Sequence, residues 1–386
     1  AKYHVAPEKP TLLIYGHYDV QPPEPLDLWH SPPFEPRLAD GNVYARGATD
    51  DKGQSFAHVK AAEALLRSEG SLPVNLIYLI EGEEEIASAN LDHWIEENKA
   101  EIQCDACVIS DTSQFAPGQP AICYGLRGIC FQEIRLEAAQ SDLHSGVFGG
   151  SVPNPANTLC EIIAQLKDES GRVRIPGFYD DVLPLEAWER EAFARLPFDD
   201  EAFRQAAGSP GLFGEAGYTT NERRWARPTL DINGIFGGYT GEGSKTIIPS
   251  WAGAKISMRL VPNQNAQVIA DLFRRYVESI TPSYVNLRFI SGGGNGPVLT
   301  PRDARFMKEA SLAFEQGFGA KPVMIREGGS IPVVLTLTRE LEVPVILMGL
   351  GRPDDNLHAP NEKFNLDDFI HGVRTAAHFY TLCAQA

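Results

Sequence analysis

The sequence is poor in cysteine, short of basic residues and free of long hydrophobic runs. Six cysteines in 386 residues are too few for a disulfide framework, so we expect buried free thiols. With 34 Lys and Arg against 51 Asp and Glu, the net charge is −17, which disfavours nucleic-acid binding. The longest apolar runs, such as 343–350, are much shorter than a membrane span. No signal pattern opens the sequence, so we expect a cytoplasmic protein with no membrane partner.

The first third of the chain alternates short apolar runs with helical patterns. We predict strands at 11–15, 74–80 and 106–110, and helices at 53–68 and 91–99. This alternation is typical of an α/β sheet whose strands are buried and largely parallel.

The pattern changes after residue 124 and returns near residue 296. Strands are predicted at 128–138, 251–261 and 284–290, with helices at 155–167 and 265–280. The glycine-rich run 292–297 is interpreted as a flexible boundary, after which helices at 301–318, 331–338 and from 366, with strands at 323–326 and 343–348, resume the first pattern. We therefore predict an α/β domain with a mixed, largely parallel sheet, made of residues 1–123 and 296–386. A smaller α+β domain, 124–295, interrupts it.

Histidine and acidic residues follow the predicted strands. Five strands in succession each end in His, Asp or Glu, which a model of random surface charge does not require. Because ligands of open α/β sheets bind at the carboxyl ends of strands, we expect these side chains to meet. They are His17, Asp50, Glu85, Asp111 and His358.

Taken singly, each of these signals also has an ordinary explanation. A surface loop accounts for His17, a helix cap for Asp50, and a solvated helix start for the acidic run 81–85. Two histidines with three or more carboxylates, however, suit zinc, with manganese or cobalt as alternatives. Five ligands exceed the four that one zinc ion takes, so we expect two divalent ions bridged by one carboxylate.

Eight segments resemble, in order along nearly the whole chain, the M20 family of di-metal peptidases. The similarity is greatest to its branch of carnosinases and cytosolic non-specific dipeptidases. The segments are GHYDVQP (16–22), ARGATDDKG (45–53), IEGEEEIAS (80–88), ISDT (109–112), DLHSGVFGG (142–150), SMRLVPNQ (257–264), REGGSIPV (326–333) and HAPNEKF (358–364). The resemblance implies a catalytic domain of the zinc-exopeptidase type and a lid domain that also forms the dimer.

The resemblance also implies roles for the candidate ligands. Asp50 would bridge the two ions, with His17 and Asp111 completing one site and Glu85 and His358 the other.

Further roles follow for residues beside the ligands. Asp19 would orient His17, and the peptide bond between Asp50 and Asp51 would be cis. Glu84 would be the general base that takes a proton from the attacking water. The neighbouring Glu83 is the alternative residue for this role.

The resemblance assigns five more residues to the substrate. His144 would reach the active site of the other subunit and stabilise the oxyanion, and Arg259 would bind the free carboxylate of the substrate. Thr246, Gly329 and Ser330 would hold the substrate backbone.

We therefore predict a homodimer, joined through the lid domain, that hydrolyses dipeptides or short peptides with a free C-terminal carboxylate. An aminoacylase or another amide hydrolase of the same family is an alternative. A non-catalytic, metal-stabilised dimeric binding protein is another, but it would be expected to lose Glu84 or His144, and this chain retains both. One departure from the family is that His17 comes almost at once, without the usual several tens of preceding residues.

Overall fold

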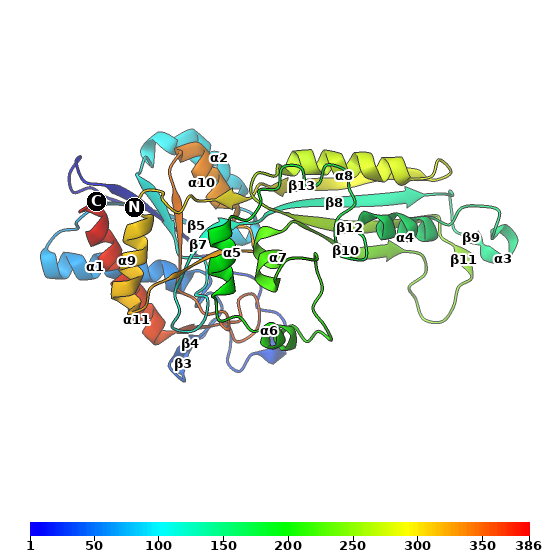
Figure 1. The fold of residues 1–386 in the computed structure, drawn as a ribbon. Coiled ribbons are helices and arrows are strands. Elements are labelled where there is room, and N and C mark those ends of the chain that lie inside the picture. Colours follow the sequence, from blue (N-terminus) through cyan, green and yellow to red (C-terminus); the bar gives the residue numbers. More distant parts are fainter. The chain divides into compact units, whose positions relative to one another are not determined.

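The computed structural model describes all of residues 1–386, which divide into two compact units. The first unit consists of Ala1–Gly125, Leu299–Arg326 and Ile331–Ala386. The other, called the inserted unit below, consists of Leu126–Val298 and Glu327–Ser330. None of the helices combines the length and apolar character that spanning a bilayer requires. Figure 1 labels the elements of both units.

The first unit is built on an eight-stranded sheet in the order β1-β5-β2-β6-β16-β7-β14, with β15 paired to β7. Strand β2 is parallel to β5 and β6, and β16 is parallel to β6, so these four carboxyl ends share one edge. Strand β1 pairs antiparallel with β5, and β7 pairs antiparallel with β16, which confirms a mixed, mostly parallel sheet. The strands are β1 (Lys2–Tyr3), β2 (Thr11–His17), β5 (Asn75–Glu81), β6 (Ala106–Ile109), β7 (Ala121–Leu126), β14 (Val298–Leu299), β15 (Val323–Glu327) and β16 (Val345–Gly349).

Two groups of helices cover this sheet, whose central strands β2, β6, β7 and β16 are largely apolar and almost wholly buried. In one group α11 (Leu366–Cys383) packs against both α1 (Lys52–Glu69) and α9 (Met307–Phe318). In the other, α2 (Ala89–Asn98) packs against α10 (Pro332–Leu341). A small separate sheet, β17-β4-β3, joins β3 (Arg37–Ala39), β4 (Asn42–Tyr44) and β17 (Lys363–Asn365). Short 3-10 helices lie at η1 (Leu26–Leu28), η2 (Glu84–Ile86) and η3 (Lys99–Glu101).

The helix predicted at 301–318 begins later than expected, at Met307. The preceding segment forms turns, in which Ala304 N–H bonds to the Pro301 carbonyl and Met307 N–H to the Ala304 carbonyl. Phe306 has φ of 68°, which a helix does not allow, and its side chain is buried. The left-handed residue therefore separates the turns from α9.

The inserted unit contains a four-stranded antiparallel sheet in the order β10-β12-β8-β13. Alternate residues of β8, including Cys130, Ile134 and Leu136, are buried, which is the pattern of a sheet covered on one face. Helices α4 and α8 supply Leu159, Ile162 and Phe273 to the same core and run along the sheet in Figure 1. The elements are β8 (Gly128–Glu137), β10 (Thr229–Gly237), β12 (Trp251–Leu260), β13 (Asn286–Asn295), α4 (Pro155–Leu166) and α8 (Ala266–Ile280).

The glycine run at 292–297 was interpreted wrongly as a flexible connection. Its first four residues belong to β13, and Gly292 and Gly294 pair with Gln132 and Cys130 of β8. Glycine is needed here for close approach: a Cβ on Gly294 would lie 2.0 Å from the Ile129 carbonyl oxygen. The glycines of this run therefore indicate close pairing between β13 and β8.

Short helices in the stretch 171–227 were not predicted. They are α5 (Ala187–Ala194), α6 (Asp200–Ala206) and α7 (Thr220–Ala226). The capping box of Thr219 and Glu222, in which each side chain bonds to the other's backbone N–H, was the available signal for α7. At the far end of the unit, β9 (Leu143–His144) pairs with β11 (Ile247–Ile248) beside α3 (Ser145–Phe148).

All six cysteines are free, as expected, but they are not all buried. Cys107, Cys123, Cys130 and Cys383 are buried, whereas Cys160 is exposed and Cys104 lies between these classes. Cys160 is exposed because it lies on the face of α4 opposite Leu159 and Ile162, away from the core.

The glycine pairing in β13 gives a stability prediction. We expect Gly294→Ala to lower the free energy of unfolding by about 1–3 kcal/mol, because the new methyl group collides with the backbone of β8. A matched control is Gly234→Ala in β10, where a Cβ meets nothing within 4 Å. Urea unfolding of the two variants should show a loss only for Gly294→Ala; equal effects would contradict the close-approach explanation.

Candidate metal centre

Four of the five predicted metal ligands come from neighbouring strand ends of the first unit. His17 is the last residue of β2, Glu85 lies in η2 after β5, Asp111 follows β6, and His358 lies in the loop after β16. The expectation that all five follow strands of one sheet was wrong for Asp50. This residue lies in the loop between β4 of the small sheet and helix α1, and that loop brings it to the same edge.

The carboxylate of Asp50 lies between the two histidines. Its Oδ1 is 3.1 Å from His17 Nε2, and its Oδ2 is 2.9 Å from His358 Nε2. Asp111 Oδ2 lies 3.8 Å from His17 Nε2, and Glu85 Oε2 lies 3.5 Å from His358 Nε2. The structure thus forms two groups that share Asp50, and the ligand atoms within each lie within 4.8 Å of one another.

These distances fit the coordination of metal ions. Ligand atoms about 2.0–2.1 Å from a tetrahedral zinc ion are separated by roughly 3.3 Å, close to the spacings around Asp50. His17 Nε2 is buried and has no hydrogen-bond partner, although it faces Asp50 and Asp111. A buried polar atom without a hydrogen bond, aimed at two carboxylates, is expected at a metal ligand.

The protonation equilibria also favour a bound cation. Burial disfavours a charge on His17, but Asp50 and Asp111 outweigh this effect and raise the pKa of His17 to about 10. Burial and the nearby Asp51 and Asp50 carboxylates raise the pKa of Asp111 well above its usual value. In the absence of metal, protons therefore compensate the clustered negative charge, and divalent ions can take their place.

Asp19 connects one ligand to the segment that carries another. Its Oδ1 lies 3.3 Å from His17 Nδ1, and its backbone carbonyl oxygen lies 3.2 Å from the same nitrogen. The Asp19 carboxylate also accepts hydrogen bonds from the backbone N–H groups of Glu84 and Glu85, at 3.3 and 3.0 Å. One side chain thus orients the imidazole and fixes the start of η2.

The structure distinguishes Glu84 from its neighbour Glu83. Glu83 accepts hydrogen bonds from the Asn90 side chain, the shorter at 2.7 Å, and from the Asn90 backbone, so it is engaged at the start of α2. Glu84 makes no such bond, and its pKa is raised to about 7, mainly by burial and further by the Glu85 and Asp50 charges. A carboxylate with a pKa near neutrality is suited to accept and release a proton.

Sequence reasoning missed the residue that holds the Asp50 loop. The fully buried Glu362 accepts hydrogen bonds from the Arg46 side chain at 2.8 Å and from the backbone N–H groups of residues 47, 49 and 50. Its position inside the segment HAPNEKF, which also contains the predicted ligand His358, was the available indication that it belongs to the site. The predicted cis peptide bond between Asp50 and Asp51 is present, which confirms that expectation.

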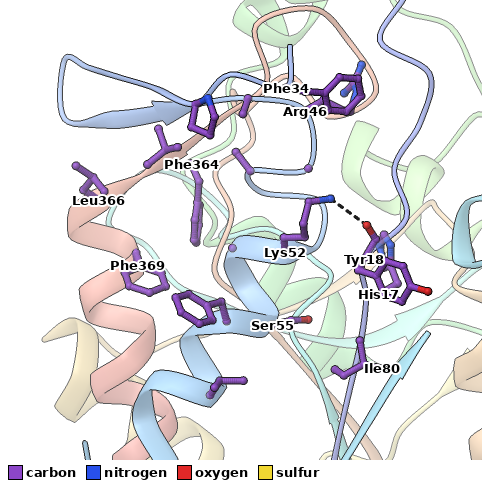
Figure 2. A pocket seen from close by; sticks show the side chains of 18 residues that line it. His17, Tyr18, Phe34, Arg46, Lys52, Ser55, Ile80, Phe364, Leu366 and Phe369 are labelled. Carbon is purple, nitrogen blue, oxygen red and sulfur yellow. Dashed lines mark hydrogen bonds between the residues drawn. The ribbon is translucent and has the colours of Figure 1, made fainter. Parts of the chain in front are cut away.

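A large apolar pocket lies beside the predicted metal ligands, of which only one forms part of its wall. It has a volume of about 710 Å³ and is lined by aromatic residues that include Phe34, Phe364 and Phe369, as Figure 2 shows. At its polar end Lys52 Nζ donates a hydrogen bond to the Tyr18 carbonyl oxygen at 3.0 Å. Of the five predicted ligands only His17 lines it, so this pocket is not the candidate centre.

The predicted substrate residues of the inserted unit form two groups. In one, Arg259 Nη1 donates a hydrogen bond to Ser330 Oγ at 3.2 Å, and Gly329 precedes Ser330. In the other, Thr246 accepts a hydrogen bond from the N–H of Ser145, next to His144, at 3.1 Å.

The two groups lie at opposite ends of β12. Thr246 precedes the start of this strand, at Trp251, whereas Arg259 lies near its end. Because each strand residue advances about 3.3 Å, Trp251 and Arg259 are separated by roughly 25 Å. The inserted unit of one chain therefore does not bring His144 and Thr246 together with Arg259 and Ser330.

Comparison with known proteins places the chain in a family. Residues 13–381 match the model described as peptidase family M20/M25/M40. The chain belongs to this family. The resemblance on which the sequence predictions depended is therefore confirmed.

The similar proteins include enzymes that act on short peptides. The chain is 36% identical over 379 residues to the Cys-Gly metallodipeptidase dug1 of Schizosaccharomyces pombe, covering 97% of this chain and 80% of that protein. It is 34% identical over 384 residues to the Beta-Ala-His dipeptidase of Homo sapiens, covering 98% and 76%. Among solved structures, the M20 family metallo-carboxypeptidase Sso-CP2 from Sulfolobus solfataricus has a TM-score of 0.89 and 34% identity, covering 100% of this chain and 87% of that one.

The Glu362 contacts give a prediction for the loop that carries Asp50. We expect Glu362→Gln to lower the free energy of unfolding by about 3–5 kcal/mol, because it leaves the buried Arg46 without its counter-charge. The exposed Glu8 supplies a control, Glu8→Gln, with little expected effect. Both would be measured by urea unfolding; a Glu362→Gln variant as stable as the control would contradict the assigned role.

Proposed function

We propose that this protein is a dipeptidase that uses two divalent metal ions to hydrolyse dipeptides or short peptides with a free C-terminal carboxylate. The observation that carries the proposal is the Asp50 carboxylate shared by two ligand groups, with Glu84 nearby, whose carboxylate makes no hydrogen bond. The similar proteins named as dipeptidases and as a metallo-carboxypeptidase support this substrate class.

The metal ligands have a defined division in this proposal. His17 and Asp111 would hold one ion, Glu85 and His358 would hold the other, and Asp50, which belongs to both groups, would be shared. Imidazole and carboxylate donors suit zinc, with manganese or cobalt as alternatives. When bound, the ions polarise the peptide carbonyl and make hydroxide available near neutral pH.

The remaining chemistry falls to the protein's own side chains. Glu84 takes the proton of the attacking water and delivers it to the leaving amine, a role that its raised pKa supports. Asp19 keeps His17 in position through the second ring nitrogen. Arg259, which forms no ion pair with a carboxylate in this chain, binds the free carboxylate of the substrate beside Gly329 and Ser330.

We also propose a homodimer in which each subunit completes the other's site. An extended dipeptide spans only about 7 Å, so it cannot contact Arg259 and His144 of one chain, which lie at opposite ends of β12. In the dimer, His144 and Thr246 therefore come from the second subunit, where His144 stabilises the oxyanion. The exposed Val147 and Phe148 beside His144 support an interface in this part of the inserted unit, which acts as lid and dimerisation domain.

Substitution of the two neighbouring glutamates tests the mechanism. We expect Glu84→Gln to lower kcat for dipeptide hydrolysis by about 10²–10⁴-fold, because it removes the proton acceptor. Glu83→Gln, which changes only a contact with Asn90, should keep most of the activity.

The same assay tests the metal requirement. A chelator should abolish hydrolysis, and added zinc or manganese should restore it. Activity that survives complete metal removal, or a near-normal kcat for Glu84→Gln, would refute the mechanism.

Mixed dimers test the donation of His144 between subunits. We expect His144→Ala and Glu84→Gln proteins to be nearly inactive alone, and to recover about one quarter of the wild-type activity when mixed equally. Half of the dimers would then be hybrids, each with one intact site. Absence of recovery, with subunit exchange demonstrated by differently tagged chains, would show that His144 does not act across the dimer.

A further inference from the structure

The inserted unit contains a pocket lined by charged side chains, none of which is a predicted metal ligand. Its volume is about 360 Å³, and it is lined by six basic side chains but only two acidic ones, Glu215 and Asp231. The imbalance points to a missing anion only if the acidic groups are already engaged.

Both acidic side chains have partners within the unit. Glu215 accepts hydrogen bonds from the Arg227 guanidinium at 2.7 and 2.8 Å, and from Arg172 at 2.9 Å. Asp231 accepts a hydrogen bond from Thr229 at 3.2 Å and lies 3.9 Å from Lys167 Nζ. Glu215 is therefore engaged by Arg227 and Arg172, and the single charge of Asp231 is shared among Lys167, Arg127 and Arg259.

Arg127 is the clearest case of a cation without a direct ion pair. Its donors reach only backbone carbonyl oxygens, with Nε 3.2 Å from that of Gly328 and Nη1 3.5 Å from that of Arg227. Burial, together with the positive charges of Arg259 and Arg224, outweighs the attraction of Asp231 and lowers the pKa of Arg127 to about 10. A partly desolvated guanidinium that faces two like charges is stabilised by an anion.

Arg224 is held in the pocket without being neutralised. Its guanidinium carbon lies 5.3 Å from the ring centres of Phe203 and Trp225, and the Glu327 carboxylate attracts its charge without a direct ion pair. Aromatic faces hold a guanidinium in place and leave its charge available.

The pocket is continuous with the proposed position of the substrate carboxylate. Arg259 lines it, and Ser330 Oγ accepts a hydrogen bond from Arg259 and donates one to the Arg127 carbonyl oxygen at 2.5 Å. The backbone N–H of Arg127 also bonds to the Glu327 carbonyl oxygen at 3.2 Å. Arg127 therefore belongs to the same group of residues as Arg259 and Ser330.

We propose that this pocket receives a second carboxylate, so that the enzyme prefers substrates whose C-terminal residue is aspartate or glutamate. Arg259 binds the main-chain carboxylate, as in the proposed function on which this inference depends, while Arg127 and Arg224 bind the side-chain carboxylate. The two carboxylates of such a residue are separated by only one or two methylene groups beyond Cα, which suits a shared pocket. An amide side chain has the same size but lacks the charge.

Pairs of dipeptides that differ only in this charge test the proposal. We expect kcat/KM for Ala-Glu to exceed that for Ala-Gln by roughly 10- to 100-fold, and Ala-Asp to exceed Ala-Asn similarly. Arg127→Met should remove most of this preference, whereas Arg127→Lys, which keeps the charge, should retain part of it. Arg195→Met removes a highly exposed arginine of the same unit and should leave the preference unchanged. If Arg127→Met does not fold, Arg224→Met serves the same purpose.

The outcomes separate this inference from the proposed function. Hydrolysis of the acidic and amide dipeptides with equal kcat/KM would overturn the inference and leave the dipeptidase proposal intact. If no dipeptide is hydrolysed, the proposed function fails, and calorimetric binding of L-glutamate and L-glutamine decides the inference. Tighter binding of L-glutamate by at least about tenfold, lost in Arg127→Met, would support the pocket, and equal binding would refute it.

Discussion

The predicted metal ligands of the first unit are arranged around one carboxylate, that of Asp50. It faces two histidines at once. His17 and His358 are separated by 341 positions in the sequence, yet both reach this side chain. Around it, Glu85 and Asp111 add negative charge in a buried setting that strongly disfavours unpaired carboxylates. Such a cluster is stable only with compensating positive charge, and shared ligands allow two ions to supply it.

The fold supplies this geometry by simple means. Parallel pairing of β2 with β5 and β6, and of β6 with β16, brings four carboxyl ends to one edge. Two further carboxylates then fix the details: Asp19 orients His17, and Glu362 holds the loop of Asp50 through backbone N–H groups. The ligands are therefore positioned by residues that need not touch a metal.

Local sequence patterns predicted the strands and helices that are specified by apolar runs and by helix-capping residues. The buried apolar runs gave the parallel strands, and Asn154 and Asn265 mark the starts of α4 and α8 with side-chain caps. Local patterns gave wrong predictions where tertiary contacts determine the backbone conformation. The glycines of β13 form a strand because β8 lies so close, and the buried Phe306 interrupts the helix predicted through it. Asp50 was expected at the end of a sheet strand, whereas it reaches the sheet edge by the loop before α1, which only the structure shows.

The central claim is a pair of metal ions bridged by Asp50, and the metal content of the purified protein tests it most directly. Elemental analysis after saturation with zinc and removal of free metal should give two ions per chain. Asp50→Asn, which keeps the shape of the side chain but removes its charge, should reduce this number below two. A single ion per wild-type chain, or two ions retained unchanged in Asp50→Asn, would contradict the account.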